Sequence, residues 1–540
     1  MRRNTPAHTP RLSPTHNFLF VSDLHLAEGT NPQTGKIARL EDFFFDDAFA
    51  NMLVYHVNLA QDPAVSSAFQ KPWKLYINGD FFEFLQVVSV PDEDSPLVKD
   101  GKIILTDHLK MYGLGTSAEE TVWKLKRIAA GHPSFFQALG WFLAHPENEL
   151  VLLRGNHDIE IVWPAVQEAI RTTIAGSYDV WYQDMINGRA PESSLPLKES
   201  LPVTLPIDFA DRIGFPEWFD YEKGLFYVEH GNQYDPVNAF ASIDRPFLES
   251  NPNLIELPSG SFFVRYLFNM VEQVHPFADN IVPLSSYINY AINLKPAETA
   301  VIFLRQPLTS FKAVFNLMRK SGKMRPEMQA GDDTVSRCPL PDDDVRAIEK
   351  VREDVSHLSR KRNKKYIRSV AAGVLLQALL WVMILLAFRG FILGFTPQTG
   401  LAIPLVLITY AWRLRLMHRL SKTPSNVGLD EAAHKINSIL NKTNNESESK
   451  SVQFLIFGHN HDPKFEELSQ HQNGRSYRQW YVNTGSWLPS FNETKTVIAD
   501  SVRLSFLRIV PDQNGFDQAL PELLEWRDTE HKPVKLKLTD

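Results

Sequence analysis

Seven candidate metal ligands lie in five short segments, and each segment follows a short apolar run. The segments are Asp23-Leu24-His25, Gly79-Asp80-Phe81-Phe82-Glu83, Gly155-Asn156-His157-Asp158, His230-Gly231 and Gly458-His459-Asn460-His461. The candidate ligands among them are Asp23, His25, Asp80, Asn156, His230, His459 and His461. Carboxylate, amide oxygen and imidazole together suit Mn, Fe or Zn better than Mg or Ca. Seven ligands exceed one tetrahedral site, so we expect two divalent ions, which can hold a hydroxide and a phosphoryl group side by side.

The apolar runs before these segments predict the strands that position them. The runs are Phe18–Val21, Leu75–Ile77, Leu150–Leu153, Leu225–Val228 and Val452–Phe457. They have strand length and carry no charge, as buried strands do. Helical segments lie between them, at Leu40–Leu59 and Ala118–Ile128. The alternation predicts an α/β fold, in which loops after the strands meet at one crevice.

Two more strands are predicted after the last metal segment. They are Tyr477–Val482 and Val502–Ile509, and the alternating pattern of the second suits an antiparallel edge strand. The sheet is therefore expected to resume after a long interruption.

The five segments, in this order, resemble the calcineurin-like metallophosphoesterase family. The family pattern is Asp-x-His, Gly-Asp-x-x-Glu or Asp, Gly-Asn-His followed by Asp or Glu, a lone His followed by Gly, and Gly-His-x-His. The resemblance covers about residues 17–235 and 452–510. It implies a two-sheet αββα sandwich, interrupted here by a large helical insert.

The resemblance also implies a role for each candidate residue. Asp23, His25 and His461 would bind one metal ion, Asn156, His230 and His459 would bind the other, and Asp80 would bridge the two. His157 would stabilise the transition state or protonate the leaving oxygen, and Asp158 would orient His157. A metal-bridging hydroxide would attack phosphorus in line. Mn is the first expectation for the two ions, with Fe or Zn as alternatives.

A narrower resemblance is to the branch that includes bacterial UDP-2,3-diacylglucosamine pyrophosphatases. It rests on Ser22-Asp23-Leu24-His25-Leu26, Gly79-Asp80-Phe81-Phe82-Glu83 and Asn483-Thr484-Gly485-Ser486-Trp487. The chain departs from that branch at His157, where the branch usually has Arg. The substrate class therefore stays open between phosphomonoesters, phosphodiesters and pyrophosphates, on a small molecule, a nucleotide or a lipid.

Length and composition bound the rest of the organisation. The 540 residues exceed one ordinary domain, and the formal net charge of −7 argues against a dedicated nucleic-acid partner. The lone cysteine, Cys338, excludes an internal disulfide and indicates a reducing compartment. We divide the chain into a disordered leader (1–16), a catalytic domain (17–235 and 452–540), two helical inserts (236–330 and 345–440) and a linker (441–451).

The second insert contains the most apolar part of the chain. Ser369–Phe388 holds 20 residues without a charge, and Gly390–Trp412 holds 23 more. Each stretch is long enough to cross a bilayer, and basic residues flank both outer sides. These features predict a transmembrane hairpin at about 369–412 that contacts the lipid bilayer. The alternative is a buried helical hairpin in a helical insert without membrane contact.

The position of the ligands constrains this hairpin. His230 lies before the apolar stretches, and His459 and His461 lie after them, so the chain must cross a membrane an even number of times. The sequence thus predicts a metal-dependent phosphoric ester hydrolase at the cytoplasmic membrane, with its site facing the cytoplasm. The alternatives are a cytoplasmic enzyme, or a membrane-anchored scaffold or regulator that keeps the fold without catalysis.

Overall fold

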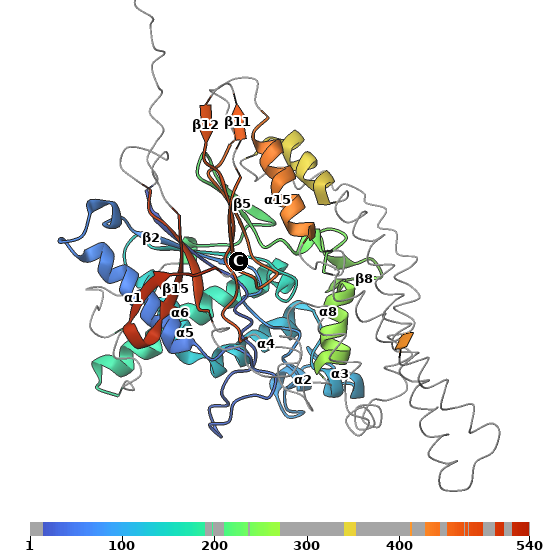
Figure 1. The fold of residues 1–540 in the computed structure, drawn as a ribbon. Coiled ribbons are helices and arrows are strands. Elements are labelled where there is room, and N and C mark those ends of the chain that lie inside the picture. Colours follow the sequence, from blue (N-terminus) through green and yellow to red (C-terminus); the bar gives the residue numbers. More distant parts are fainter. Residues whose placement is uncertain are drawn as a thin grey trace, which may run out of the picture.

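Two β-sheets form the centre of the structure (Figure 1). The larger sheet has the strand order β16 (Lys532–Lys535), β15 (Glu522–Arg527), β14 (Ser505–Ile509), β1 (Asn17–Val21), β2 (Trp73–Asn78), β3 (Glu149–Leu153) and β4 (Ile213–Gly214). The smaller sheet has the order β10 (Lys464–Glu467), β13 (Trp480–Asn483), β9 (Phe454–Phe457), β6 (Phe226–Glu229) and β5 (Phe219–Glu222). Strands β1 to β4 are parallel, and so are β13, β9 and β6.

This architecture comes from a computed structural model of the chain. It describes residues 15–189, 197, 210–235, 238–269, 340–352, 411–412, 427–442, 451–468, 470–472, 475–489, 503–511 and 521–538.

The central strands are mostly apolar because both of their faces are buried. In β1, Phe18 and Phe20 point toward the smaller sheet, while Leu19 and Val21 point toward the helices on the other face. This is the period-2 alternation of a strand. Phe226 of the smaller sheet packs edge-on against Phe20, with ring centroids 5.1 Å apart. The two sheets therefore share one apolar layer between them.

Helices cover the outer face of each sheet. The larger sheet packs against α1 (Asp46–Gln61), α4 (Ala118–Gly131), α5 (Pro133–Ala144) and α6 (Pro164–Ile186). The smaller sheet packs against α15 (Val427–Leu440) and the helical residues 342–352. Neighbouring residues determine where α4 begins, since Ser117 and Glu120 form a reciprocal capping box.

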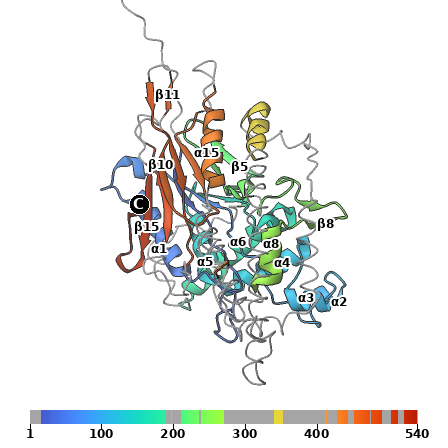
Figure 2. The ribbon, with the colours of Figure 1, turned by 45° about the vertical axis from the view of Figure 1, so that its right-hand side comes forward.

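Smaller elements lie outside the two main sheets. They include α2 (Pro96–Lys99), α3 (Asp107–Tyr112), the ribbon β7 (Phe247–Leu248) and β8 (Asn251–Ile255), and α8 (Ser259–Phe263) with the π-helical residues Val264–Phe268. In Figures 1 and 2, α8 lies beside α4. A second ribbon joins β11 (Gln470–Gln472) to β12 (Arg475–Tyr477).

The predicted fold class is wrong in its transmembrane hairpin. In the described part of the chain, no helix is both long enough and apolar enough to cross a bilayer. The longest, α6, has 23 residues but carries Glu168, Arg171, Asp179 and Asp184. The apolar α5 has only 12 residues, about 18 Å of helix against a hydrocarbon core of about 30 Å. Of the span expected to form the hairpin, about 369–412, all but residues 411–412 lie outside the described residues.

Other sequence predictions can be compared with the structure directly. All five strands predicted before the metal segments are present. The strand predicted at Val502–Ile509 forms as β14, but it is not an edge, because β1 and β15 pair with its two sides. The insert predicted from residue 236 is not helical at its start, where β7 and β8 form. Residues 1–14, residues 270–330 and Cys338 lie outside the described residues.

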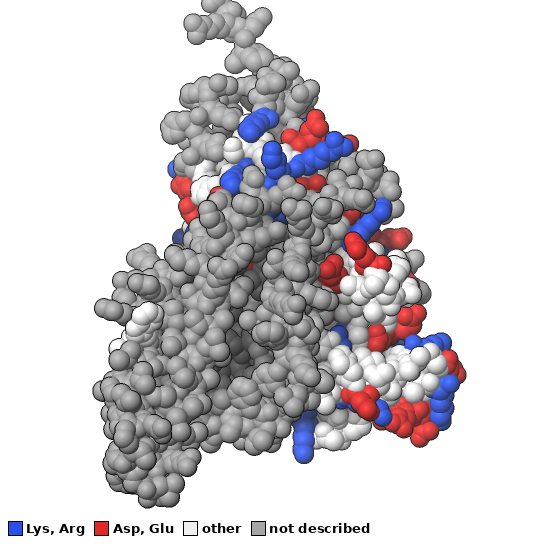
Figure 3. All heavy atoms as spheres, turned by 90° about the vertical axis from the view of Figure 1, so that its right-hand side faces the viewer, with Lys and Arg blue, Asp and Glu red and all other residues white. Residues whose placement is uncertain are grey.

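Acidic and basic side chains are interspersed on the described part of the face seen in Figure 3. Near α2 and α3 they form exposed pairs, Lys110 with Glu93 at 2.6 Å and Lys99 with Asp94 at 3.0 Å. Exposed pairs of this kind contribute little to stability.

Candidate metal centre

The five predicted segments meet where the two sheets present the carboxyl ends of their parallel strands. Asp23, Asp80 and Asn156 follow β1, β2 and β3 of the larger sheet. His230 and His459 follow β6 and β9 of the smaller sheet. Backbone hydrogen bonds join neighbouring segments, such as Asp23 N–H to the carbonyl of Gly79 at 3.2 Å. The convergence therefore follows from the strand order.

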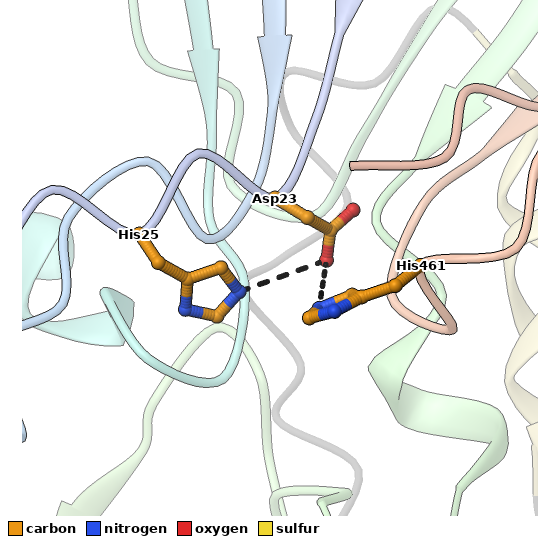
Figure 4. Close-up of side chains that lie close together, drawn as sticks. All are labelled: Asp23, His25 and His461. Carbon is orange, nitrogen blue, oxygen red and sulfur yellow. Dashed lines mark ion pairs between the residues drawn. The ribbon is translucent and has the colours of Figure 1, made fainter. Parts of the chain in front are cut away.

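Asp23, His25 and His461 form a first group of possible ligands (Figure 4). Asp23 Oδ1 lies 3.3 Å from His461 Nε2 and 4.0 Å from His25 Nε2. Two ligand atoms about 2.1 Å from one ion in tetrahedral arrangement lie about 3.4 Å apart. The three side chains thus have the spacing that one cation requires.

Asp80, His230 and His459 form a second group. Asp80 Oδ2 lies 3.1 Å from His230 Nε2 and 3.7 Å from His25 Nε2, a member of the first group. Asp80 therefore stands between the two groups, as a bridging carboxylate would. Asn156 is 2% exposed and follows the neighbouring strand β3.

Several polar atoms of these groups are buried without a hydrogen-bond partner in the described structure. They include Asp23 Oδ1, His25 Nε2, Asn156 Oδ1 and His230 Nε2. A buried polar atom without a partner costs about 1–3 kcal/mol. All four can offer a lone pair to a cation, so the donor set fits metal ions.

The backbone of the site is strained in a way that few other described residues share. Asp23, His25, Asp80, His459 and His461 all have positive φ, between 49° and 74°. Residues other than glycine seldom adopt this left-handed conformation, which costs of order 1–3 kcal/mol each. Such strain persists where surrounding contacts determine it and clusters at functional sites.

Two glycines of the motifs are required because a neighbouring ligand side chain lies against each of them. A Cβ at Gly155 would lie 2.1 Å from Asp80 Oδ1, and a Cβ at Gly79 would lie 2.4 Å from the His230 ring. Glycine at these positions thus lets two ligands approach the neighbouring backbone.

Glu83 has a role that the sequence analysis did not assign, although it lies in the Gly-Asp-x-x-Glu segment. Its Oε2 lies 2.8 Å from His25 Nδ1 and 2.5 Å from His157 Nδ1, and its Oε1 accepts the N–H of Leu85 at 3.2 Å. Glu83, His25 and His157 also have the spacing of a possible third metal group. Two nitrogens near a single oxygen instead suit hydrogen bonds, which leave both Nε2 atoms directed elsewhere.

Asp158 does not make the contact expected of it. Its carboxylate accepts the N–H groups of Gly155 and Phe81, both at 2.7 Å, and so ties the loop after β3 to the loop after β2. The carboxylate in contact with the His157 ring is Glu83. Burial, with Asp80 nearby, raises the pKa of Asp158 to about 7.

The electrostatics favour ionised ligand carboxylates. Burial acts to raise the pKa of Asp80, but His230 and His157 hold it well below its usual value. The pKa of Asp23 is lowered by His230 and His461 against the same effect of burial. In turn, Asp80 and Asp23 raise the pKa of His230 to about 9, although burial opposes this shift. Both carboxylates are therefore ionised and available to cations, which would displace the proton held by His230.

The segment Asn483–Trp487 clamps together the two sheets at the site. Asn483 Nδ2 donates to the carbonyl of Gly458 at 2.6 Å, directly before His459. The hydroxyls of Thr484 and Ser22 lie 2.7 Å apart, directly before Asp23. These contacts are buried. They fix the distance between ligands that are far apart in the sequence.

Two further partners orient ligand histidines. His230 Nδ1 lies 2.8 Å from the carbonyl oxygen of Asn78, which leaves Nε2 toward Asp80. Asp235 Oδ2 lies 3.4 Å from His459 Nε2. Asp235 follows His230 by five residues without any recognisable pattern, so the sequence carries no signal for this contact.

Comparison of the chain with known protein families found no matching family, and comparison with curated proteins found no match.

Proposed function

We propose that this chain is a metal-dependent phosphoesterase with two divalent ions, which hydrolyses a phosphoester or pyrophosphate bond. The observation that carries the proposal is the pair of adjacent ligand groups that share Asp80. The order of the five motifs, which resembles the metallophosphoesterase pattern, supports the same class of reaction.

Each residue has a distinct part in this proposal. Asp23, His25 and His461 would hold one ion, with Asn156, His230 and His459 on the other and Asp80 between them. The cations would lower the pKa of a water molecule and polarise a phosphoryl oxygen. Mn fits the mixed oxygen and nitrogen donors, as do Fe and Zn.

His157 is suited to proton transfer at the leaving oxygen. Its Nδ1 faces Glu83, which directs Nε2, on the other side of the ring, away from this carboxylate. Burial acts to raise the pKa of Glu83, but His157 and His25 lower it, so the carboxylate is ionised and stabilises a protonated imidazole. The side chain of His157 is 15% exposed, which permits contact with a substrate.

A Mn-dependent substrate screen tests the proposal. Phosphomonoesters, phosphodiesters, nucleotide-linked pyrophosphates and lipid pyrophosphates are offered to the full chain and to His157→Ala. We expect hydrolysis by the parent, and loss of turnover with retained metal in His157→Ala. His434, exposed on α15, provides the matched control, and His434→Ala should behave as the parent. A parent that hydrolyses none of these substrates with Mn bound would refute the proposal in favour of a scaffold or regulator.

A further inference from the structure

A short helical segment outside the two sheets presents a buried polar face to the candidate centre. It comprises α8 (Ser259–Phe263), the π-helical residues Val264–Phe268 and Asn269. Ser261, Arg265 and Asn269 recur at intervals of four residues, so they share one face. Their exposures are 0%, 5% and 2%.

Each of these three side chains donates a hydrogen bond to a backbone carbonyl of a loop. Ser261 Oγ donates to Asn156 at 3.1 Å, Arg265 donates to Gly113 at 3.0 Å, and Asn269 Nδ2 donates to Leu85 at 2.8 Å. Buried polar groups cost free energy unless they are bonded. A helix face used only for packing would be apolar. The three hydrogen bonds therefore indicate that this face holds the loops in a particular orientation.

The contact of Ser261 reaches the candidate ligands through one peptide group. The carbonyl of Asn156 and the N–H of His157 belong to the same peptide plane. Ser261 Oγ–H binds the carbonyl, and Asp80 Oδ1 accepts the N–H at 2.8 Å. The peptide is therefore held from both sides, which restricts its rotation. A hydrogen bond to the carbonyl also polarises the N–H and strengthens its bond to Asp80.

The contact of Asn269 reaches Glu83 in a similar way. Asn269 holds the carbonyl of Leu85, and the N–H of Leu85 donates to Glu83 Oε1 at 3.2 Å. The other oxygen of Glu83 faces His25 and His157. Asn269 thus holds the residue that orients the carboxylate.

Arg265 fastens the middle of the segment. Its guanidinium lies above the ring of Tyr266, 5.4 Å from the centroid, and its donor contact is to the residue that ends α3. Among the described residues, the Nε of Arg265 is buried and has no hydrogen-bond partner. The segment is attached to the loops by the three hydrogen bonds.

We propose that Ser261 and Asn269 are positioning residues for the candidate metal centre, through which the segment 259–269 sets the geometry of the loops carrying Asn156, His157 and Glu83. The inference rests on the proposed function for its catalytic consequence. It concerns the helical segment that follows the β7–β8 ribbon, and it gives that segment a direct influence on the rate of hydrolysis.

The test compares Ser261→Ala, Ser261→Thr, Asn269→Asp and Tyr266→Leu with the parent. Ser261→Ala and Asn269→Asp each remove one donor, and we expect kcat to fall about three- to tenfold in each, the effect of one hydrogen bond, with KM within twofold. Ser261→Thr keeps a hydroxyl and should restore the parent kcat. Tyr266→Leu is the control, since Tyr266 packs on Tyr112 and Phe262; it should lower only the Tm.

A second measurement follows the metal independently of turnover. Titration of the metal-depleted protein with Mn should show weaker binding of one of two ions in Ser261→Ala, by a similar factor. Unchanged kcat and unchanged Mn affinity in both Ser261→Ala and Asn269→Asp would overturn the inference, as would an equal loss in Tyr266→Leu. If the parent hydrolyses nothing, the proposed function fails, while the Mn titration still decides whether Ser261 positions the centre.

Discussion

Replacement of Glu83 by Gln tests how the centre fixes its histidines. The carboxylate is 1% exposed and lies against His25 Nδ1 and His157 Nδ1 with one oxygen and Leu85 N–H with the other. Gln has one oxygen and one NH2 group. If the Gln oxygen faces the two histidines, the NH2 group faces the N–H of Leu85. In the opposite orientation, the NH2 group faces the two histidine rings. In either orientation, at least one hydrogen bond of Glu83 is lost.

The size of the effect follows from these contacts. A hydrogen bond to a charged group contributes about 1.5–3 kcal/mol, and each 1.36 kcal/mol corresponds to a factor of ten. Loss of one such bond predicts a fall in kcat of about ten- to 150-fold. Partners that orient metal-bound histidines also affect metal affinity by about ten- to 100-fold, so Mn should bind more weakly at the group that contains His25.

The assay combines steady-state hydrolysis with Mn titration, and Glu41→Gln is the matched control. Glu41 is also a buried carboxylate that contacts a histidine, His132 at 3.1 Å, and backbone N–H groups. We expect Glu41→Gln to lower the Tm without changing kcat or Mn affinity. Parent values of kcat and Mn affinity in folded Glu83→Gln would refute the assignment of Glu83 as the orienting carboxylate.

Two further predictions concern other buried polar contacts. Asn483→Ala should weaken Mn binding about tenfold, since it removes the hydrogen bond to Gly458 directly before the ligands and the one accepted from Gly485 N–H. Gln479→Ala, directly before the other end of β13, should change only the Tm. Equal Mn affinities in the two variants would contradict the role of Asn483–Trp487 at the site. For His132, burial lowers the pKa, but hydrogen bonds to Asp46 and Glu41 raise it to about 10 from an ordinary 6.5. The folded state thus binds the extra proton, and its stabilisation is present below pH 6.5 and lost as the pH rises toward 10. The Tm of the parent should fall over this range more steeply than that of His132→Gln, and parallel Tm profiles would contradict it.

The strands could be predicted from the sequence because each one is a run of consecutive apolar residues, which indicates a buried strand. Runs such as Phe18–Val21 are apolar at every position, since one side faces the other sheet and one side faces the helices. The position of β14 inside the sheet could not be predicted in this way. It depends on pairing with β1, which is far away in the sequence, and with β15, whose residues were not predicted to form a strand.

The convergence of the candidate ligands could also be predicted, since each follows a strand. The partners of those ligands could not. Glu83 contacts His157, which lies 74 residues later in the sequence, only because the loops after β2 and β3 are neighbours. Ser261 and Asn269 have no local pattern that distinguishes them from an ordinary polar helix face. The transmembrane prediction is wrong on a different point, since no helix among the described residues is both long enough and apolar enough to cross a bilayer.

A crystal structure of the Mn-loaded protein, with anomalous scattering recorded to locate the ions, tests the central claim most directly. We predict two peaks about 3.5–4 Å apart. One should lie among Asp23, His25 and His461, the other among Asn156, His230 and His459, with Asp80 touching both. A single peak, peaks away from these residues, or no Mn at saturating concentration would contradict the account.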